Sequence, residues 1–269
     1  MRQQKITTTV LLEMKARGEK IAALTAYDAP TSALLNESGI DIVLVGDSVG
    51  NVKLGYANTL PVTLAEILHH TQAAARGNSR AMLVADMPYL TYQLSIQTAK
   101  ENAGKLIKEG GAHAVKVEGG LEIANAVKAL CDLHIPVMGH LGLTPQYIHK
   151  IGGYTMQGKT PSDRNKIVTD AKILEGAGVF ALVLECIPAD LAQEITAKVN
   201  VPTIGIGSGP HCNGQILVID DMLGLSPDPL PKFVKTYARL RLEMQAAIQR
   251  YSAEVKSGAY PEGKSAPQA

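Results

Sequence analysis

Several kinds of residue are scarce in this chain of 269 residues, and each scarcity excludes a class of function. Tryptophan is absent and phenylalanine occurs only twice. No basic run carries interleaved aromatic residues, so a surface that stacks on nucleic-acid bases is not expected. The formal net charge is only +1, which provides no global field toward nucleic acid or an anionic membrane. We therefore expect partners that are neither nucleic acids nor membranes.

Cysteines and long apolar stretches are scarce as well. The three cysteines, Cys131, Cys186 and Cys212, lie far apart and form neither a C-x-x-C pair nor a zinc-binding spacing. A small, odd number of cysteines favours a reducing compartment over a disulfide framework. No stretch approaches the roughly 18 apolar residues of a membrane span, and the first twenty residues lack the apolar core of a signal peptide. We expect a cytoplasmic protein.

What the sequence does contain is a series of eight short apolar runs, each followed by a polar residue or a glycine. In chain order they are Ile21–Leu24, Ile42–Val45, Met82–Ala85, Ala114–Val117, Val137–Met138, Phe180–Leu184, Thr203–Ile206 and Ile216–Ile219. They are almost continuously apolar rather than alternating, which is typical of parallel strands that are buried on both faces.

Segments of helical character separate most of these runs. Thr63 and Glu66 have the spacing of a capping box, which predicts a helix that continues through Ala75. Further helices are expected at Ser95–Lys108, Leu121–Asp132, Asp163–Gly176 and Ala189–Val199. Alternating strands and helices predict a parallel sheet, and eight repeats in about 250 residues predict a closed (β/α)8 barrel, the TIM barrel. A doubly wound open sheet is the alternative.

The predicted domain organisation is one catalytic barrel domain over residues 1–256, with an N-terminal and a C-terminal helix. Residues 257–269, rich in Gly, Pro, Ser and Lys, are predicted to form a flexible tail. Apolar residues from Phe233 to Tyr251 recur at helical spacing, which indicates either packing on the barrel or an oligomer interface. The glycine-rich segment Gly152–Pro161 is either a mobile lid or an ordinary surface loop.

Polar residues of catalytic type lie within, or one to three residues after, five consecutive apolar runs. In a barrel these strand ends all face one mouth. A single Asp after a strand is often only a turn residue or a helix cap. Carboxylates on three consecutive strands, however, repel one another unless a cation lies between them, and oxygen ligands suit Mg²⁺. The residues are Asp47 with Ser48, Asp86, Lys116 with Glu118, His140 and Glu185.

Two of these residues allow more than one interpretation. Lys116 precedes Glu118 by two positions, so both side chains point to the same face of the strand. Lys116 could neutralise the acids or contact a substrate carboxylate; a Schiff base is a third option, which the metal makes unnecessary. For His140, a structural hydrogen bond or a substrate contact is favoured over metal binding, because Mg²⁺ prefers oxygen.

Nine ordered segments of the chain resemble the ketopantoate hydroxymethyltransferase family. They are VGDSVG (45–50), LPVT (60–63), VADMPY (84–89), VKVEGG (115–120), GHLGLTPQ (139–146), IGGYTMQG (151–158), LVLECIP (182–188), IGIGSG (204–209) and GQILV (214–218). The resemblance implies transfer of a hydroxymethyl group from 5,10-methylenetetrahydrofolate, with water, to 3-methyl-2-oxobutanoate. The products would be tetrahydrofolate and 2-dehydropantoate, an intermediate of pantothenate biosynthesis.

The resemblance also implies residue roles. Mg²⁺ would be held near Asp47, Asp86 and Glu118, and it would act as a Lewis acid toward an enolate of the substrate. Glu185 would be the general base that removes the C3 proton. The residues expected to line the 2-oxo-acid site are Asp47, Ser48, Asp86, Lys116 and His140. Family members form large homo-oligomers, typically decamers, which favours the interface interpretation of the C-terminal helix.

Three positions depart from the family pattern. Asn213 replaces a common Asp, Asp220 stands where a His is expected, and Ser208 replaces a frequent Ala. None is a matched catalytic position, so we expect the activity to be intact. The segment 205–209, Gly-Ile-Gly-Ser-Gly, predicts either a phosphate-binding loop or a tight turn.

Two other functions share some of these features. A different Mg²⁺ barrel enzyme, such as a 2-oxo-acid C–C lyase or an enzyme like phosphoenolpyruvate mutase, would carry the same acids at the strand ends. Dependence on folate would separate it from the transferase. A non-catalytic assembly protein on a barrel scaffold would tolerate loss of the acids. Fold alone does not choose between these functions, whereas the ordered motifs favour the transferase.

Overall fold

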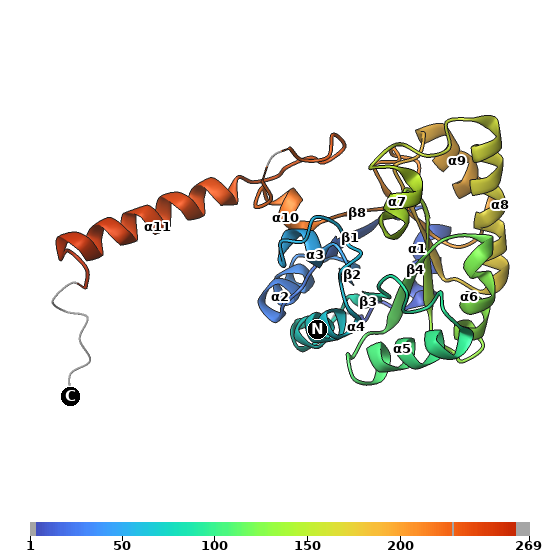
Figure 1. Cartoon of the computed structure of the whole chain (residues 1–269), viewed down its shortest axis with the longest axis horizontal. Helices are drawn as coiled ribbons and strands as arrows, with labels where there is room; N and C mark the ends of the chain where they lie inside the picture. The colour runs from blue at the N-terminus through green and yellow to red at the C-terminus, as the bar shows by residue number, and fades with distance from the viewer. Residues whose placement is uncertain (1–3, 228, 262–269) are drawn as a thin grey trace. The chain divides into compact units, whose positions relative to one another are not determined.

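Eight parallel strands close into a barrel in the computed structural model of the chain, which describes residues 4–227 and 229–261 (Figure 1). Each strand pairs with the next, and the last pairs with the first. The predicted (β/α)8 barrel is therefore confirmed, and the open-sheet alternative is wrong. The strands are β1 (Ile21–Thr25), β2 (Ile42–Val45), β3 (Met82–Asp86), β4 (Ala114–Glu118), β5 (Val137–Gly142), β6 (Ala181–Glu185), β7 (Thr203–Ile206) and β8 (Gly214–Leu217).

The last strand begins earlier than its apolar run suggested. The expected run was Ile216–Ile219, but β8 starts at Gly214, and Ile219 already belongs to a helix. A Cβ atom at position 214 would lie 2.4 Å from the backbone oxygen of Ile21 on β1. The closure of the barrel therefore needs a glycine at this position, and a search for apolar residues alone misses the start of the strand.

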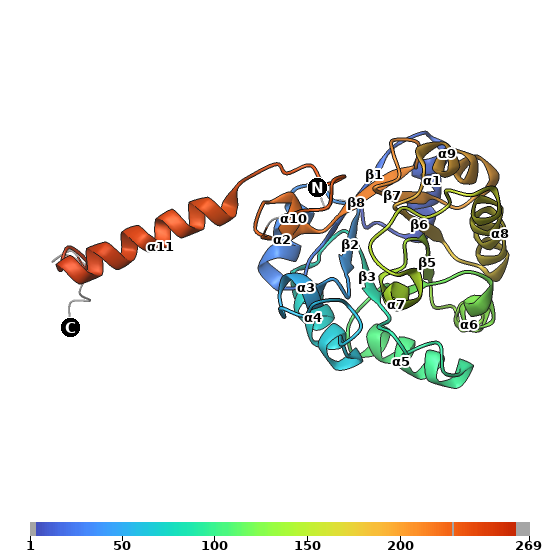
Figure 2. The ribbon, with the colours of Figure 1, turned by 45° about the horizontal axis from the view of Figure 1, so that its top comes forward.

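Helices lie around the outside of the strands (Figures 1 and 2). The predicted helix after Thr63 is confirmed together with its capping box. Glu66 N donates to Thr63 Oγ1 over 3.2 Å, and Thr63 N donates to Glu66 Oε2 over 2.7 Å. The helices of the barrel unit are α1 (Thr8–Ala16), α2 (Ala29–Glu37), α3 (Val49–Val52), α4 (Leu64–Gly77), α5 (Ile96–Lys108), α6 (Ala124–Cys131), α7 (Ile148–Ile151), α8 (Pro161–Ala177) and α9 (Ala189–Lys198), with 3-10 turns η1 (Leu121–Ile123) and η2 (Pro145–Tyr147).

The inward-facing side chains of β3 and β6 change from apolar to acidic toward the C-terminal end of the strand. On β3, Met82 and Val84 belong to the apolar core, and the next residue of the same face is Asp86. Because side chains alternate between the two faces of a strand, every second residue lines the interior. By the same alternation β6 ends its inward row at Glu185. The polar residues thus continue the rows of the core at the C-terminal end of the barrel.

The N-terminal end of the barrel is closed by apolar side chains. Leu11 and Met14 of α1 belong to the same buried cluster as Ile6 and Phe180, together with the apolar residues inside the barrel. This end therefore has a structural role, and the polar residues gather at the opposite end, as in other barrels of this type.

Residues from Ile219 onward form a second unit with helices α10 (Ile219–Met222) and α11 (Leu240–Ser257). The helical spacing suggested a helix from Phe233, but α11 begins seven residues later. The backbone N–H groups of Tyr237 and Leu240 donate to Met222 O and Leu223 O instead. These bonds hold the segment before Leu240 in a non-helical conformation.

Helix α11 carries no buried residue, and Met244, Ile248, Tyr251 and Val255 are among its exposed apolar side chains. A single catalytic domain over residues 1–256 stays a prediction, since the observed division follows Val218. Residues 262–269 of the predicted tail lie outside the described residues. Among the helices of the described ranges, none is long and apolar enough to cross a membrane.

Candidate active site

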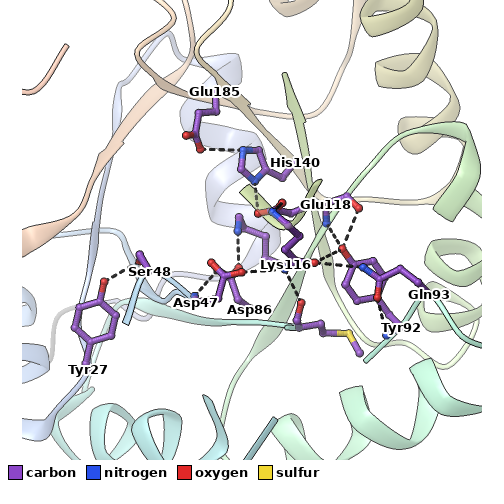
Figure 3. Close-up of polar contacts among 12 residues, drawn as sticks. Tyr27, Asp47, Ser48, Asp86, Tyr92, Gln93, Lys116, Glu118, His140 and Glu185 are labelled. Atoms are coloured by element: carbon purple, nitrogen blue, oxygen red, sulfur yellow. Dashed lines mark hydrogen bonds and ion pairs between the residues drawn. The ribbon is translucent and has the colours of Figure 1, made fainter. Parts of the chain in front are cut away.

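The structure brings the predicted site residues together at the C-terminal mouth of the barrel (Figure 3). Strand register explains much of this, because Asp86 pairs with Lys116 and Glu118 pairs with His140. Register partners on adjacent strands place their side chains next to each other on the same face of the sheet. The remaining residues come from elsewhere on the rim: Asp47 and Ser48 follow β2, and Glu185 ends β6.

Lys116 and Asp86 form a buried ion pair. Lys116 Nζ donates to Asp86 Oδ1 over 2.5 Å, while the Asp47 backbone N–H donates to Asp86 Oδ2 over 2.9 Å. Burial opposes the charge on Lys116, but the fields of Asp86, Glu118 and Asp47 outweigh it and hold the pKa of Lys116 above its usual range. A lysine that stays protonated is a poor nucleophile, so this environment does not favour a Schiff-base role.

The environment of Asp47 disfavours the ionised form of its carboxyl group. It is buried, and burial together with the negative charges of Asp86 and Glu118 raises its pKa well above the usual value. Lys116 and a hydrogen bond from Gln146 oppose the shift without cancelling it. A cation placed beside Asp47 would remove this penalty, because a bound metal is the largest local charge in such a site.

His140 lies between two carboxylates. Its Nδ1 is 3.2 Å from Glu118 Oε1, and its Nε2 is 3.1 Å from Glu185 Oε2, an ion-pair distance without hydrogen-bond alignment (Figure 3). Burial alone would lower the pKa of His140, but the charge of Glu118 and both carboxylate contacts raise it to about 9. In turn, His140 and Lys116 outweigh burial and lower the pKa of Glu118. His140 thus connects a predicted metal ligand to the predicted base.

Gln146 is a residue of this site whose role the sequence did not reveal. Its backbone N–H donates to Glu118 Oε2 over 3.0 Å, and its side-chain Nε2 donates to Asp47 Oδ2 over 3.0 Å. Its Oε1 accepts from Tyr92 Oη over 2.8 Å and from Gln93 Nε2 over 3.3 Å, which sets the orientation of the amide. Gln146 therefore fixes two acids from two different strands. Its position as the last residue of the GHLGLTPQ motif was the one feature of the sequence that could have indicated a role in the site.

Ser48 is held by a tyrosine from the first strand end. Tyr27 Oη lies 2.9 Å from Ser48 Oγ (Figure 3), and the tyrosine ring is buried. Gly46 makes room for this arrangement, because a Cβ at that position would lie 2.7 Å from Ser48 Oγ. The predicted substrate contact of Ser48 thus has a supporting partner that follows β1.

The acids and bases of the site are unequal in number. Four carboxylates surround two basic groups, and this excess of negative charge, with oxygen donors, fits a divalent cation such as Mg²⁺. As placed, however, no three His, Cys, Asp or Glu side chains of the described residues form a ready metal-binding group. Hydrogen bonds from Lys116, Gln146 and His140 occupy carboxylate oxygens instead. Mg²⁺ would therefore bind here only after side-chain adjustment or through bridging waters.

The segment 205–209 forms a tight turn that supports the end of β6. Ser208 Oγ donates to Leu184 O over 2.7 Å and accepts from Ile187 N over 3.3 Å. Gly209 has a φ of 75°, and a Cβ there would lie 2.5 Å from the side chain of Ala189. These contacts favour the turn over the phosphate-binding interpretation. Ser208 also stabilises the segment that carries Glu185.

The chain is similar to a family of known enzymes over nearly its whole length. The model of the ketopantoate hydroxymethyltransferase family matches residues 5–263. The 3-methyl-2-oxobutanoate hydroxymethyltransferase of Thermoanaerobacter pseudethanolicus is 54% identical over 260 residues, which are 97% of this chain and 95% of that protein. The enzyme of the same name from Moorella thermoacetica is 53% identical over 260 residues, 97% of each chain.

Solved structures of low sequence identity share the fold. Phosphonopyruvate hydrolase, in a complex with oxalate and Mg²⁺, superposes with a TM-score of 0.62 at 12% identity, covering 97% of this chain and 91% of that chain. The 2,3-dimethylmalate lyase of the PEP mutase/isocitrate lyase superfamily superposes with a TM-score of 0.59 at 12% identity, covering 97% and 92%. At this identity the likeness concerns the barrel and not the reaction.

Proposed function

Because the chain belongs to the ketopantoate hydroxymethyltransferase family, we propose that its barrel mouth binds 3-methyl-2-oxobutanoate beside Mg²⁺ and that Glu185 is the general base. The protein is an enzyme that transfers a hydroxymethyl group to 3-methyl-2-oxobutanoate, a step of pantothenate biosynthesis. This activity implies 5,10-methylenetetrahydrofolate as the one-carbon donor. The proposal assigns individual steps to individual residues.

The net reaction makes one carbon–carbon bond. The C3–H bond of the oxo acid breaks, and C3 joins the methylene carbon of the folate. Both bonds from that carbon to the folate nitrogens break, and water supplies the hydroxyl oxygen. The two nitrogens gain one proton from C3 and one from water, so tetrahydrofolate and 2-dehydropantoate leave together. The enzyme must therefore first remove a proton that is only weakly acidic.

The metal site is proposed at the three acids of β2, β3 and β4. Asp47, Asp86 and Glu118 would hold Mg²⁺ directly or through waters, since Mg²⁺ retains several waters in most proteins. The excess of buried carboxylates over basic groups supports this assignment. When bound, Mg²⁺ would supply Lewis acidity at the keto oxygen and a template for the oxo acid.

Lys116 and Ser48 are proposed to bind the substrate carboxylate. The Lys116 ammonium keeps its charge in the presence of the acids around it, and a charged donor makes a strong hydrogen bond to an anion. Ser48 is held in place by Tyr27, so its hydroxyl is oriented before the substrate arrives. Together the two residues would fix C3 in one orientation relative to the base.

The observation that carries the assignment of Glu185 is a difference in exposure. The side chain of Glu185 is 15% exposed, whereas those of Asp86 and Glu118 are 3% and 1% exposed. Glu185 also comes from β6, opposite β2 in the barrel and two strands beyond β4, the last strand that carries a proposed metal ligand. A carboxylate that faces the open mouth from this side can reach C3 while the other acids hold the metal.

Hydrogen exchange isolates the step assigned to Glu185, because proton removal does not need the folate. We expect the enzyme with Mg²⁺ alone to exchange the C3 hydrogen of 3-methyl-2-oxobutanoate in D₂O, as followed by NMR. Glu185→Gln keeps the shape of the side chain but removes the base, so exchange should fall by roughly 10²–10⁴-fold. Mg²⁺ affinity, measured by calorimetry, should hardly change.

Asp86→Asn is the variant to compare with Glu185→Gln, because it makes the same carboxylate-to-amide change in a proposed metal ligand. It should weaken both Mg²⁺ binding and exchange, because it removes a negative charge from the proposed ligands. Exchange at the wild-type rate in Glu185→Gln would show that Glu185 is not the base, and His140 would become the next candidate.

The proposal extends to the state of the protein in the cell. We expect a cytoplasmic homo-oligomer, a decamer by the family resemblance. The three cysteines are all free, in keeping with a reducing compartment. The exposed apolar face of α11 supports an interface between copies of the chain.

A further inference from the structure

The segment 152–160 connects α7 to α8 (Figure 2) and is hydrogen-bonded to the residue that follows the proposed base. Gln157 N donates to the backbone oxygen of Cys186 over 2.9 Å, and Cys186 directly follows Glu185. Gly158, with a φ of 73°, packs against α9 so closely that a Cβ would lie 2.5 Å from Leu191. The C-terminal part of this segment is therefore held beside the end of β6.

Tyr154 and Met156 precede this attachment and remain open to solvent, with exposed fractions of 58% and 42%. Gly152 and Gly153 lead into them with φ values of 80° and 135°, a conformation that favours glycine. The pKa of Tyr154 is raised by partial burial and by the charges of Glu185, Asp47 and Glu118. Gln157, three residues after Tyr154, is hydrogen-bonded to Cys186 O, so the segment that carries the exposed ring lies next to Glu185.

Flat apolar surface is rare in this chain, which has nine tyrosines, two phenylalanines and no tryptophan. Tyr27 and Tyr92 are buried in the framework of the site and offer no open face. Among the described tyrosines of the barrel unit, Tyr56 and Tyr147 are half-buried, and Tyr89, on the loop after β3, is the other exposed one, at 36%. Of these two exposed tyrosines, Tyr154 belongs to the segment that is hydrogen-bonded next to Glu185.

We propose that the segment 152–160 is a lid that binds the folate co-substrate, with Tyr154 supplying the face against which the tetrahydropteridine ring packs. This inference rests on the proposed function. The methylene carbon must reach the C3 atom that Glu185 deprotonates, so the ring that carries it must lie beside Glu185. Aromatic side chains provide large flat contact areas for such rings. Tyr154 offers that surface from a segment anchored at Cys186.

The test varies methylenetetrahydrofolate at saturating 3-methyl-2-oxobutanoate and Mg²⁺. Tyr154→Ala should raise the KM for the folate by about 10- to 100-fold, the range for loss of one ring-stacking contact. Tyr154→Phe retains the ring and should restore the KM to within about threefold of the wild type. C3 hydrogen exchange, which needs no folate, reports separately on the acids and on folding.

Tyr89→Ala is the matched control, because it removes an exposed tyrosine from another rim loop. Its KM for the folate should stay at the wild-type value. The lid proposal is overturned if Tyr154→Ala leaves the KM for the folate unchanged, or if Tyr89→Ala raises that KM instead. It is also overturned if Tyr154→Ala abolishes C3 hydrogen exchange. Wild-type protein without exchange or turnover would overturn the proposed function itself, a result distinct from those three.

Discussion

Among single residues, Lys116 is the cation that we propose binds the substrate carboxylate. It lies on the inward row of β4, two residues before Glu118, and forms an ion pair with Asp86 over 2.5 Å. The surrounding acids maintain its charge by holding its pKa high. A carboxylate of the substrate could share this ammonium with Asp86, since an ammonium has three donors.

Lys116→Ala should weaken binding of the oxo acid more than binding of the folate. Loss of a hydrogen bond to a charged group costs roughly 1.5–3 kcal/mol, so the KM for 3-methyl-2-oxobutanoate should rise about 10- to 150-fold. Steady-state kinetics with each substrate varied in turn measures the difference. Lys108→Ala, which removes an exposed lysine at the end of α5, is the control. An unchanged KM for the oxo acid in Lys116→Ala would count against this role.

Among the secondary-structure elements, the start of helix α4 is set by capping hydrogen bonds, whereas the strands are positioned by pairing with their neighbours. Thr63 and Glu66 form both hydrogen bonds of a capping box at the start of α4. Helix α4 in turn contacts α2, where Gly77 allows a close approach: a Cβ there would lie 2.1 Å from Ala29 O. The start of α4 is therefore well defined by local chemistry, away from the acids of the site.

Thr63→Ala should lower the free energy of unfolding by about 1 kcal/mol, because an N-cap hydroxyl is lost. The midpoint of thermal unfolding should fall by about 2–4 °C for a protein of this size. Thr63→Ser keeps the oxygen and should stay within a few tenths of a kcal/mol of the wild type. Equal stability of the Ala and Ser variants, with both as stable as the wild type, would show that the cap contributes nothing.

At the scale of the whole molecule, α11 presents an apolar stripe. Met244, Ile248, Tyr251 and Val255 follow the spacing of one helical face and are exposed. Exposed apolar side chains in such an array mark a contact surface in most proteins. The partner that we propose for this stripe is a second copy of the chain.

Ile248→Asp should reduce the mass of the assembly measured by light scattering, because it places a charge in the centre of the stripe. The wild type should have about ten times the 28.5 kDa mass of one chain. Ala246→Asp adds the same charge on the opposite face of α11 and should leave the mass unchanged. A monomeric wild type would contradict the oligomer, and an unchanged mass in Ile248→Asp would exclude this stripe as the interface.

Residue patterns along the chain were enough to predict the barrel, ahead of an open sheet, and the members of its acidic cluster. Strands buried on both faces must be apolar along their length, so eight runs could be counted directly. Asp86, Glu118 and Glu185 end such runs, and parallel strands bring their ends to one mouth. These signals are local, because each depends only on residues adjacent in the chain.

Which of these groups contact one another became clear from the three-dimensional structure alone. Gln146 is uncharged and lies 99 residues from Asp47, so its bond to that acid has no local signal. His140 faces Glu118 and Glu185 because barrel closure sets the register of three strands. The late start of α11 at Leu240 likewise depends on backbone bonds to a distant segment. Long-range contacts depend on geometry that residue patterns alone do not specify.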